Sequence, residues 1–166
     1  MPRHPTPEQR KETAAPPPPP PEPLAHPGRV AAWMAKQVEL GLDSVELSLP
    51  QYRILTLLDA GPTIPSTLAD RLAVRPPSVT AVVDGLVGRG LVDRAHREDD
   101  RRRVSHTLTP EGRRLLAAAD AAVEARLDAI AGCLPNQQLV RRATASLGVW
   151  QQALLAHRAR VMAERG

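Results

Sequence analysis

The chain has 166 residues, of which 42% are hydrophobic, with a formal net charge of +4 and a sequence pI of about 10.2. This length suits one domain with a substantial core, and the basic surface favours a polyanionic partner. Aromatic residues make up only 2% and Cys133 is the single cysteine, which argues against a base-stacking platform for single-stranded nucleic acid, a cysteine-rich zinc site and an intrachain disulfide.

Residues 1–26 are predicted to be a disordered tail. They contain a proline run from Pro16 to Pro21 and almost no large apolar residues, so they cannot bury enough surface to offset their ordering entropy. A docking site for a proline-binding domain is the alternative, for which polyproline alone is a weak signal. The chain shows neither the apolar region of a signal peptide nor a membrane-spanning apolar run, so we expect a cytoplasmic protein without a membrane partner.

The next segment predicts three helices. Apolar residues recur in steps of three and four over residues 28–46, which indicates one face of a helix, and this helix should end near Pro50. Pro50 then opens a second helix, which Gly61 ends. A short third helix follows Pro65, with its leucine and alanine side chains facing inward.

A fourth helix is predicted after Pro76 and Pro77, which are tolerated in a first turn whose N–H groups lack intrahelical partners. Its apolar residues from Val79 to Leu86 are spaced as one buried face. Gly90 is well placed to end it.

The periodicity then changes to the alternation of strands. Residues 91–94 are short and β-capable, residues 97–102 form a charge cluster, and residues 103–108 alternate polar with apolar side chains. Two strands around a polar tip predict a β-hairpin, and Thr109 is a good N-cap for the helix that follows.

Two helices complete the chain. A long helix is expected from Pro110 to about Ala131, with Pro135 as its breaker, and a last helix from about Asn136 to Ala163. Cys133 lies near the break, where we interpret it as a small buried hydrophobe; a redox sensor is the alternative.

This order of elements predicts a mainly α fold with a small β-hairpin wing. Residues 27–166 would form one domain, with a winged helix-turn-helix lobe at 50–109 and flanking helices at 27–48 and 110–166. Such a lobe places the start of its second helix in the major groove, while the hairpin reaches phosphates or the minor groove.

Several short segments repeat a recognisable pattern. They are Leu49-Pro50-Gln51-Tyr52, Leu68-Ala69-Asp70-Arg71-Leu72-Ala73-Val74, Ser78-Val79-Thr80, Arg89-Gly90-Leu91-Val92, Asp100-Arg101-Arg102 and Leu108-Thr109-Pro110-Glu111-Gly112. With these segments, residues 50–112 resemble the MarR family of bacterial transcription regulators. The last two, at their spacing, are the most specific part of the resemblance.

The resemblance implies a homodimer, with the first and the last two helices at its interface. Each subunit would read one half of a pseudo-palindrome, with half-sites about 10 base pairs apart. The candidate interface residues in the last helix are Leu139, Leu147, Trp150 and Leu154.

The family also often binds small phenolic or anionic effectors beside the dimer helices. Trp33, Tyr52 and Arg53 lie in segments that would line such a crevice. The alternative is ordinary packing for Trp33 and a solvated surface for the other two residues.

The charge cluster of the wing provides the main DNA-contact candidates. Asp100 can hold Arg102 in one rotamer by a charge-assisted hydrogen bond, so that Arg102 enters the minor groove. The residues expected to follow the phosphates are Arg97, Arg101 and Arg103. The alternative is a solvated cluster in which these arginines pair with the neighbouring acidic residues.

The fourth helix provides the second set of candidates. Its outward residues near the start are Pro77, Ser78 and Ala81, with Thr80 at the edge, and Arg75 precedes them. Ser78 and Thr80 can hydrogen-bond phosphates or bases. Relatives often carry arginine where Ala81 and Gly85 stand, so we expect the wing and DNA shape to supply more of the specificity here.

Together these features predict a sequence-specific duplex-DNA-binding regulator, a ligand-responsive repressor acting as a homodimer. A winged-helix protein–protein interaction module without sequence-specific DNA binding is the alternative. The chain shows no nucleophile elbow, phosphate-binding loop or metal-ligand spacing, so we expect no enzyme activity, no cofactor and no metal.

Overall fold

The computed structural model describes residues 26–97 and 100–165, so the tail predicted at 1–26 lies almost wholly outside the described residues. The side chains of residues 96–103 also lie outside the description. The elements in chain order are α1 (Pro27–Leu42), the 3-10 helix η2 (Asp43–Val45), α2 (Leu49–Asp59), α3 (Pro65–Leu72), α4 (Pro76–Gly88), β1 (Val92–Arg97), β2 (Asp100–Leu108), α5 (Pro110–Ala131) and α6 (Gln137–Arg165).

Proline and side-chain caps define where the helices begin. Each of the helices α1 to α5 carries a proline in its first turn, where the missing N–H removes no helical bond. Ser48 and Gln51 form a reciprocal capping box at α2, with nitrogen–oxygen distances of 3.4 and 3.0 Å. Thr109 caps α5 as predicted, accepting a hydrogen bond from the Gly112 N–H at 2.9 Å.

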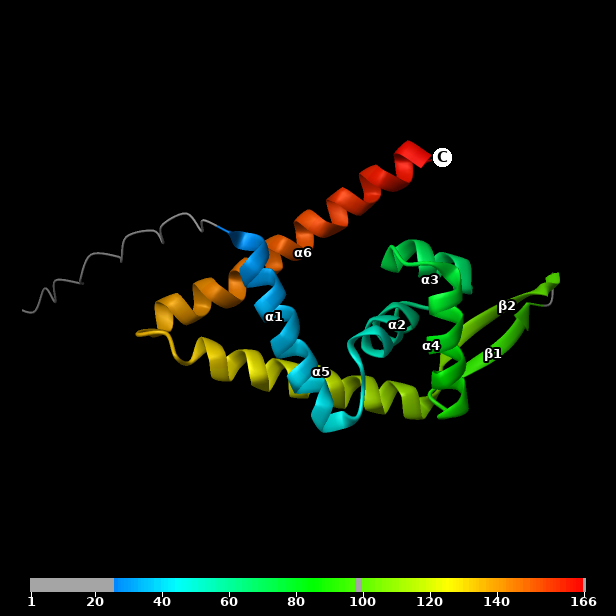
Figure 1. The fold of residues 1–166 in the computed structure, drawn as a ribbon, viewed down its shortest axis with the longest axis horizontal. Coiled ribbons are helices and arrows are strands. Elements are labelled where there is room, and N and C mark those ends of the chain that lie inside the picture. The colour runs from blue at the N-terminus through cyan, green and yellow to red at the C-terminus, as the bar shows by residue number, and fades with distance from the viewer. Residues whose placement is uncertain (1–25, 98–99, 166) are drawn as a thin grey trace, which may run out of the picture.

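The helices form an elongated molecule with the winged lobe at one end (Figure 1). The long helix α5 runs beneath the molecule, and α1 crosses over it. Helices α2, α3 and α4 gather with the hairpin around the N-terminal part of α5, while α6 turns back from its other end.

The hairpin is longer and its tip shorter than the sequence suggested. The two strands pair antiparallel from Val92↔Leu108 to His96↔Val104, and after an irregularity Arg97 pairs with Asp100. Most of the charge cluster expected at a polar tip therefore belongs to the strands. Thr63 adds a bridge to the outer side of β2, with backbone hydrogen bonds to His106 in both directions.

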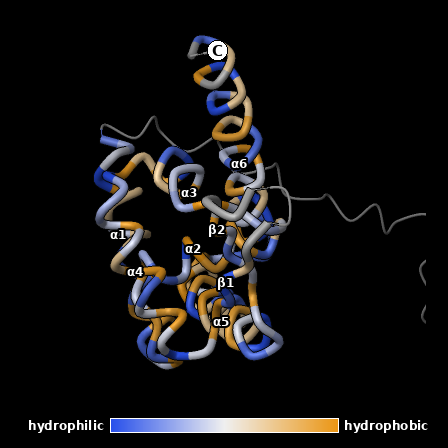
Figure 2. The backbone as a smooth tube through the Cα atoms, turned by 90° about the vertical axis from the view of Figure 1, so that its right-hand side faces the viewer, coloured by the Kyte–Doolittle hydropathy of each residue, from blue (hydrophilic) through white to orange (hydrophobic). Residues whose placement is uncertain are grey.

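One core joins the winged lobe to α5, and Figure 2 shows its hydrophobic segments meeting around α2, β1 and α5. The buried apolar residues are Leu42, Leu47, Ile54, Leu55, Leu58, Leu68, Ala69, Val79, Val83, Leu86, Leu91, Val92, Leu108, Leu116, Ala119 and Val123. Two glycines permit close approach within it. A Cβ on Gly41 of α1 would lie 3.2 Å from the Val123 Cα of α5, and one on Gly112 would lie 2.0 Å from the Leu91 carbonyl oxygen.

Several expectations from the pattern were wrong. The first helix ends at Leu42, because a 3-10 turn and a left-handed residue, Glu46 with φ 54°, redirect the chain before α2. Cys133, interpreted as a small buried hydrophobe, is exposed at the turn after α5. Trp33, for which ordinary packing was the alternative to an effector contact, is 68% exposed.

Candidate nucleic-acid interface

Helix α4 has one buried and one open face. Val79, Val83 and Leu86 are buried in the core, as their spacing predicted. The candidates Pro77, Ser78, Thr80 and Ala81 are exposed, as is Arg75, which holds the N-cap position without a side-chain cap bond. The start of α4 is thus free to approach a partner.

The open face of α4 carries unusually small side chains, and we call it the low face. Ala81, Gly85 and Gly88 follow one another at helical spacing, and a Cβ on either glycine would meet nothing within 4 Å. Thr80 directs its hydroxyl to the Pro76 carbonyl oxygen at 3.3 Å. A surface placed against this face would therefore meet the helix backbone more closely than usual.

Side-chain contacts tie α4 and the turn after it to the neighbouring segments. Arg94 of β1 forms an ion pair with Asp84 of α4. Beyond the C-terminus of α4, Thr109 donates to the Gly90 carbonyl oxygen at 2.8 Å, and Arg89 donates to the Glu46 carbonyl oxygen at 3.1 Å. The helix and wing therefore belong to one unit.

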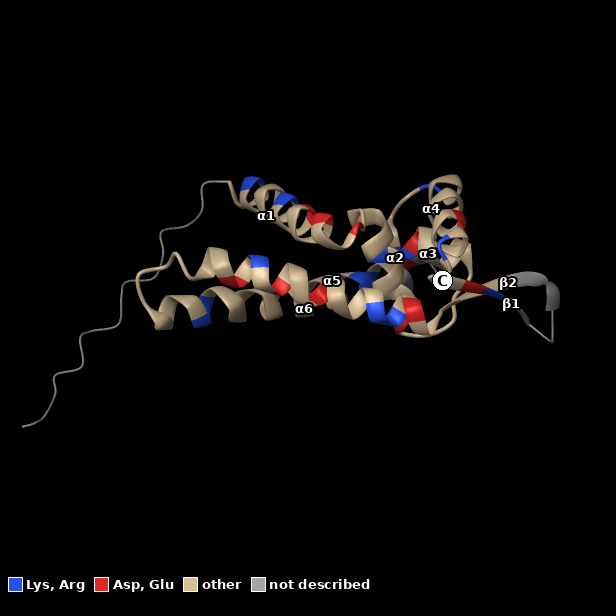
Figure 3. Cartoon of the chain, turned by 90° about the horizontal axis from the view of Figure 1, so that it is seen from below, with Lys and Arg blue, Asp and Glu red and all other residues tan. Residues whose placement is uncertain are grey.

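The hairpin extends beyond the helical body from the same end that carries α4 (Figure 3). The backbones of Arg97, Asp100, Arg101, Arg102 and Arg103 belong to its strands. Their side chains lie outside the described residues, so the Asp100–Arg102 hydrogen bond and the phosphate contacts stay predictions.

A small cavity between α4 and the hairpin was missed at the sequence level. It encloses about 290 Å³ and is lined by Pro65, Thr80, Val83, Asp84, Arg94, Val104 and His106. His106 is only 4% exposed. The alternation of residues 104–108, which puts His106 on the face of its apolar neighbours Val104 and Leu108, was the signal that could have revealed it.

The three effector candidates do not come together. Trp33 lines a groove of about 840 Å³ between α1, α5 and α6. Tyr52 instead donates a hydrogen bond to the Asp120 carboxylate of α5 at 2.6 Å, and Arg53 is exposed outside the groove. The arrangement gives no single pocket that contains all three residues.

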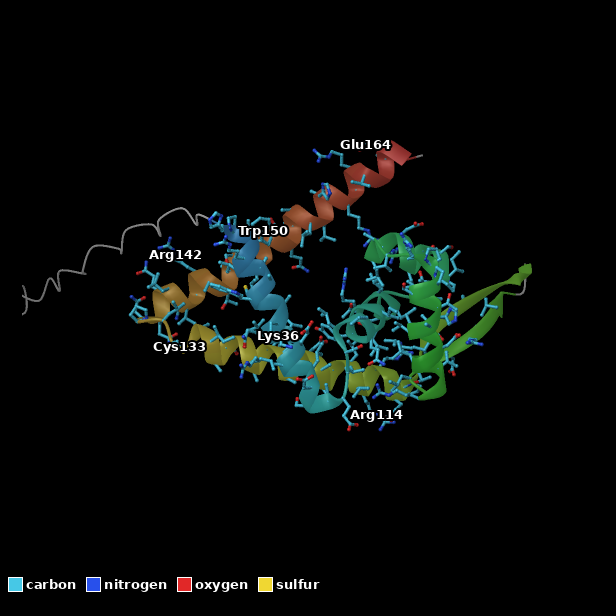
Figure 4. The ribbon with its side chains drawn as sticks, viewed as in Figure 1. Lys36, Arg114, Cys133, Arg142, Trp150 and Glu164 are labelled. Atoms are coloured by element: carbon cyan, nitrogen blue, oxygen red, sulfur yellow. The ribbon has the colours of Figure 1, made fainter. Side chains whose placement is uncertain are left out.

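The dimer candidates on α6 are largely open to solvent. Trp150 and Leu154 are each 63% exposed and Leu147 is 39% exposed, while Leu139 is half-buried. Figure 4 shows Trp150 on α6, and Cys133 at the turn between α5 and α6. In the described part of the chain, α6 packs chiefly against α5.

Within residues 26–97 and 100–165, no three His, Cys, Asp or Glu side chains are arranged to hold a metal ion. In the same part of the chain, every helix is too short or too polar to cross a membrane.

The comparison with known sequences decides the family. The MarR family profile matches residues 47–104. The HTH-type transcriptional repressor Rv2887 of Mycobacterium tuberculosis is 33% identical over 128 residues, which cover 72% of this chain and 88% of that repressor. The chain belongs to the MarR family. The predicted membership is confirmed.

Other relatives of this MarR-family protein match over shorter stretches. The uncharacterized HTH-type transcriptional regulator Mb0904 of Mycobacterium bovis is 38% identical over 87 residues, and the match spans 52% of this chain and 61% of that regulator. These relatives are named as HTH-type transcriptional regulators, and this chain spans less than two thirds of the length of Mb0904.

Solved MarR-family structures agree with the predicted fold. The transcriptional repressor CouR bound to a 23-mer DNA duplex is 29% identical with a TM-score of 0.64, over 78% of this chain and 88% of CouR. CouR from Rhodococcus jostii RHA1 bound to p-coumaroyl-CoA is 28% identical with a TM-score of 0.58, over 72% of this chain and 85% of that one. The winged helix-turn-helix prediction is confirmed.

Proposed function

We propose that this protein is a homodimeric transcription repressor that binds a pseudo-palindromic duplex operator in the cytoplasm and releases it in response to a small ligand. The observation that carries the DNA-binding part is the exposed start of α4 beside a hairpin whose strands carry Arg97 and residues 101–103. A helix end that fits the major groove and a basic ribbon at its side suit duplex DNA.

Readout by this protein would depend strongly on DNA shape. The low face formed by Ala81, Gly85 and Gly88 offers no long hydrogen-bond donor to a base edge. Ser78 and Thr80 are the polar side chains at the start of α4, and Arg102 is the proposed minor-groove residue. Sequence preference should then be strongest where the wing meets a narrow minor groove.

The homodimer is supported by the exposed apolar face of α6. A helix of 29 residues gains most of its stability from packing an apolar face, yet Trp150 and Leu154 remain mostly exposed in one subunit. Exposed apolar surface of this kind marks interaction sites. A second copy would cover α6 and the groove that Trp33 lines.

The ligand response is supported by likeness to CouR, which was solved with p-coumaroyl-CoA bound. Trp33, Tyr52 and Arg53 stay the proposed contacts. Aromatic acids and their coenzyme A thioesters are the compounds to test. They should release the operator at micromolar to millimolar concentrations while leaving the dimer intact.

The alternative is a protein–protein interaction module, which the lack of long polar side chains on the open face of α4 favours. Selection of duplexes from a random pool by the purified full chain separates the two functions. The repressor should enrich a two-fold symmetric sequence with half-sites about 10 base pairs apart. An unenriched pool would favour the interaction module.

Two measurements on the selected duplex complete the test. If four to six basic residues per dimer neutralise phosphates, log K should fall with log salt at a slope of about −4 to −5. Arg102→Ala should weaken binding strongly while dimerisation and melting stay unchanged. Loss of folding in this variant would instead assign Arg102 a structural role.

A further inference from the structure

The buried histidine of the wing is not used by the proposed contacts to DNA. His106 lies on β2 with 4% of its surface exposed, and its Nδ1 atom has no hydrogen-bond partner among the described residues. Buried polar atoms in native structures nearly always have a partner, so an unpaired one calls for an explanation. Its position suggests what the imidazole does.

His106 lies where three parts of the DNA-binding lobe meet. Its backbone N–H donates to the Thr63 carbonyl oxygen at 2.8 Å, and its carbonyl oxygen accepts from the Thr63 N–H at 3.1 Å. Arg94 is its cross-strand partner on β1. Its side chain lines the cavity shared with Thr80 and Asp84 of α4. A change in the charge or hydrogen bonding of this imidazole would therefore affect the positions of both the wing and α4.

Two charged groups face His106 from the elements packed around it. They are Arg94 on β1 and Asp84 on α4, which pair with each other. The segment leading into α3 contributes Thr63 and Pro65, neither of which titrates. Helix α2 also packs against β2, and its charged residues are exposed to solvent.

These surroundings oppose a positive charge on the ring. Burial lowers the pKa of His106 below its ordinary value of 6.5, Arg94 lowers it further, and Asp84 acts in the opposite direction. A protonated ring would lie beside the Arg94 guanidinium and compete with it for one carboxylate. If one of these two cations pairs with the Asp84 carboxylate, the other loses its partner. The contact that holds α4 to β1 would then be weakened.

We propose that neutral His106 is a positioning residue that holds α4 and the wing in their DNA-binding arrangement, and that its protonation in mild acid releases the DNA. This inference rests on the proposed function. The proton is taken up from solvent as the α4–wing contact loosens. Mild acid is therefore the signal, and loss of the operator is the response.

The direction in which DNA affinity changes with pH distinguishes protonation of His106 from protonation of exposed histidines. Protonation of exposed histidines makes a protein more positive, which strengthens binding to a polyanion. Protonation of His106 instead favours the loosened lobe, so affinity should fall as the pH falls below the lowered pKa of His106 in the free protein. Opposite directions make the two effects easy to distinguish.

The experiment measures the affinity of the full chain for its selected duplex at pH 7.5 and 5.5 and constant ionic strength. The wild-type protein should bind more weakly at pH 5.5, by up to about tenfold, which is the most that one proton contributes one pH unit below the ordinary histidine pKa of 6.5. His106→Gln, which cannot take up the proton, should bind equally at both values. The matched control is His157→Gln, at an exposed position on α6, which should keep the wild-type response.

A second measurement covers the case in which His106→Gln does not fold. Histidine ring resonances of the wild-type chain are followed through a pH titration, free and bound to the duplex. Since linkage is reciprocal, bound DNA should lower the His106 midpoint. Equal midpoints in both states, or an acid response kept by a folded His106→Gln, would overturn the inference. A wild-type chain that binds no duplex at pH 7.5 would instead refute the proposed function.

Discussion

Gly112 shows how a single hydrogen atom in place of a side chain allows the wing to meet α5. The first turn of α5 lies so close to the start of the hairpin that a Cβ would come within 2.0 Å of the Leu91 carbonyl oxygen. That oxygen already accepts the Thr109 N–H at 3.1 Å, so it is not free to move. The glycine of the Leu108–Gly112 segment is thus required by packing.

Gly112→Ala should therefore lower the free energy of unfolding by about 3 kcal/mol, because the backbone must shift to accept the methyl group. Chemical denaturation followed by circular dichroism measures this loss. Gly88→Ala is the control: its Cβ meets nothing, and alanine favours the helix by about 1 kcal/mol. Equal behaviour of the two variants would contradict the packing argument.

Tyr52 provides the second prediction at the residue scale. Burial and the Asp120 carboxylate both raise the pKa of this phenol above its ordinary value of 10.0. The neutral donor is thus favoured by folding, and its contribution to stability should be complete below pH 10 and be lost as the pH rises further. Tyr52 is the single tyrosine, so an ultraviolet absorbance titration reports on it alone.

Native protein should ionise at higher pH than protein unfolded in urea. In Tyr52→Phe, the loss of this donor should cost about 1–2 kcal/mol, because a half-buried carboxylate loses its partner. Asp120→Asn keeps an acceptor and should cost less. Coincident titration curves for the folded and unfolded chain would show that the hydrogen bond does not form.

At the scale of elements, local chemistry accounts for what the sequence could predict. The prolines that open the helices, the cap at Thr109 and the apolar spacing of α4 each depend on neighbours along the chain. The hairpin length, the Thr63 bridge and the burial of His106 depend on segments far apart in sequence. Pattern reasoning therefore found the wing but missed the buried imidazole.

The turn between α3 and α4 carries a prediction at this scale. Ala73 follows α3 in a left-handed conformation with φ 54°, which costs a residue with a Cβ more than it costs glycine. Ala73→Gly relieves this strain and should raise the free energy of unfolding by up to about 1 kcal/mol. The greater conformational entropy of glycine in the unfolded chain reduces this gain. A thermal melt checks it. A lower melting temperature would show that unfolded-state entropy outweighs the strain.

At the scale of the molecule, the division between lobe and α6 decides how DNA is reached. The lobe shares one buried core with α5, whereas α6 leaves large apolar side chains exposed. Under the proposed function the two regions have separate partners, duplex DNA for the lobe and a second copy of the chain for α6. Loss of the contact between subunits should leave the lobe folded, and loss of the contact with DNA should leave α6 folded.

Trp150→Glu combined with Leu154→Glu should convert a dimer into an 18.0 kDa monomer, because two charges per subunit would enter an apolar interface. Light scattering after size exclusion measures the mass. Operator affinity should fall about 100-fold or more, since each lobe would then bind its half-site without the second lobe held nearby. Binding to one isolated half-site should stay unchanged.

The matched control is Gln152→Glu, which adds a negative charge between these residues in sequence but on the opposite side of α6. It should leave both mass and affinity unchanged, because an exposed polar position accepts a charge at little cost. If the double variant stays dimeric and binds the full operator normally, the second copy must pack elsewhere. The half-site spacing would then be set by another part of the chain.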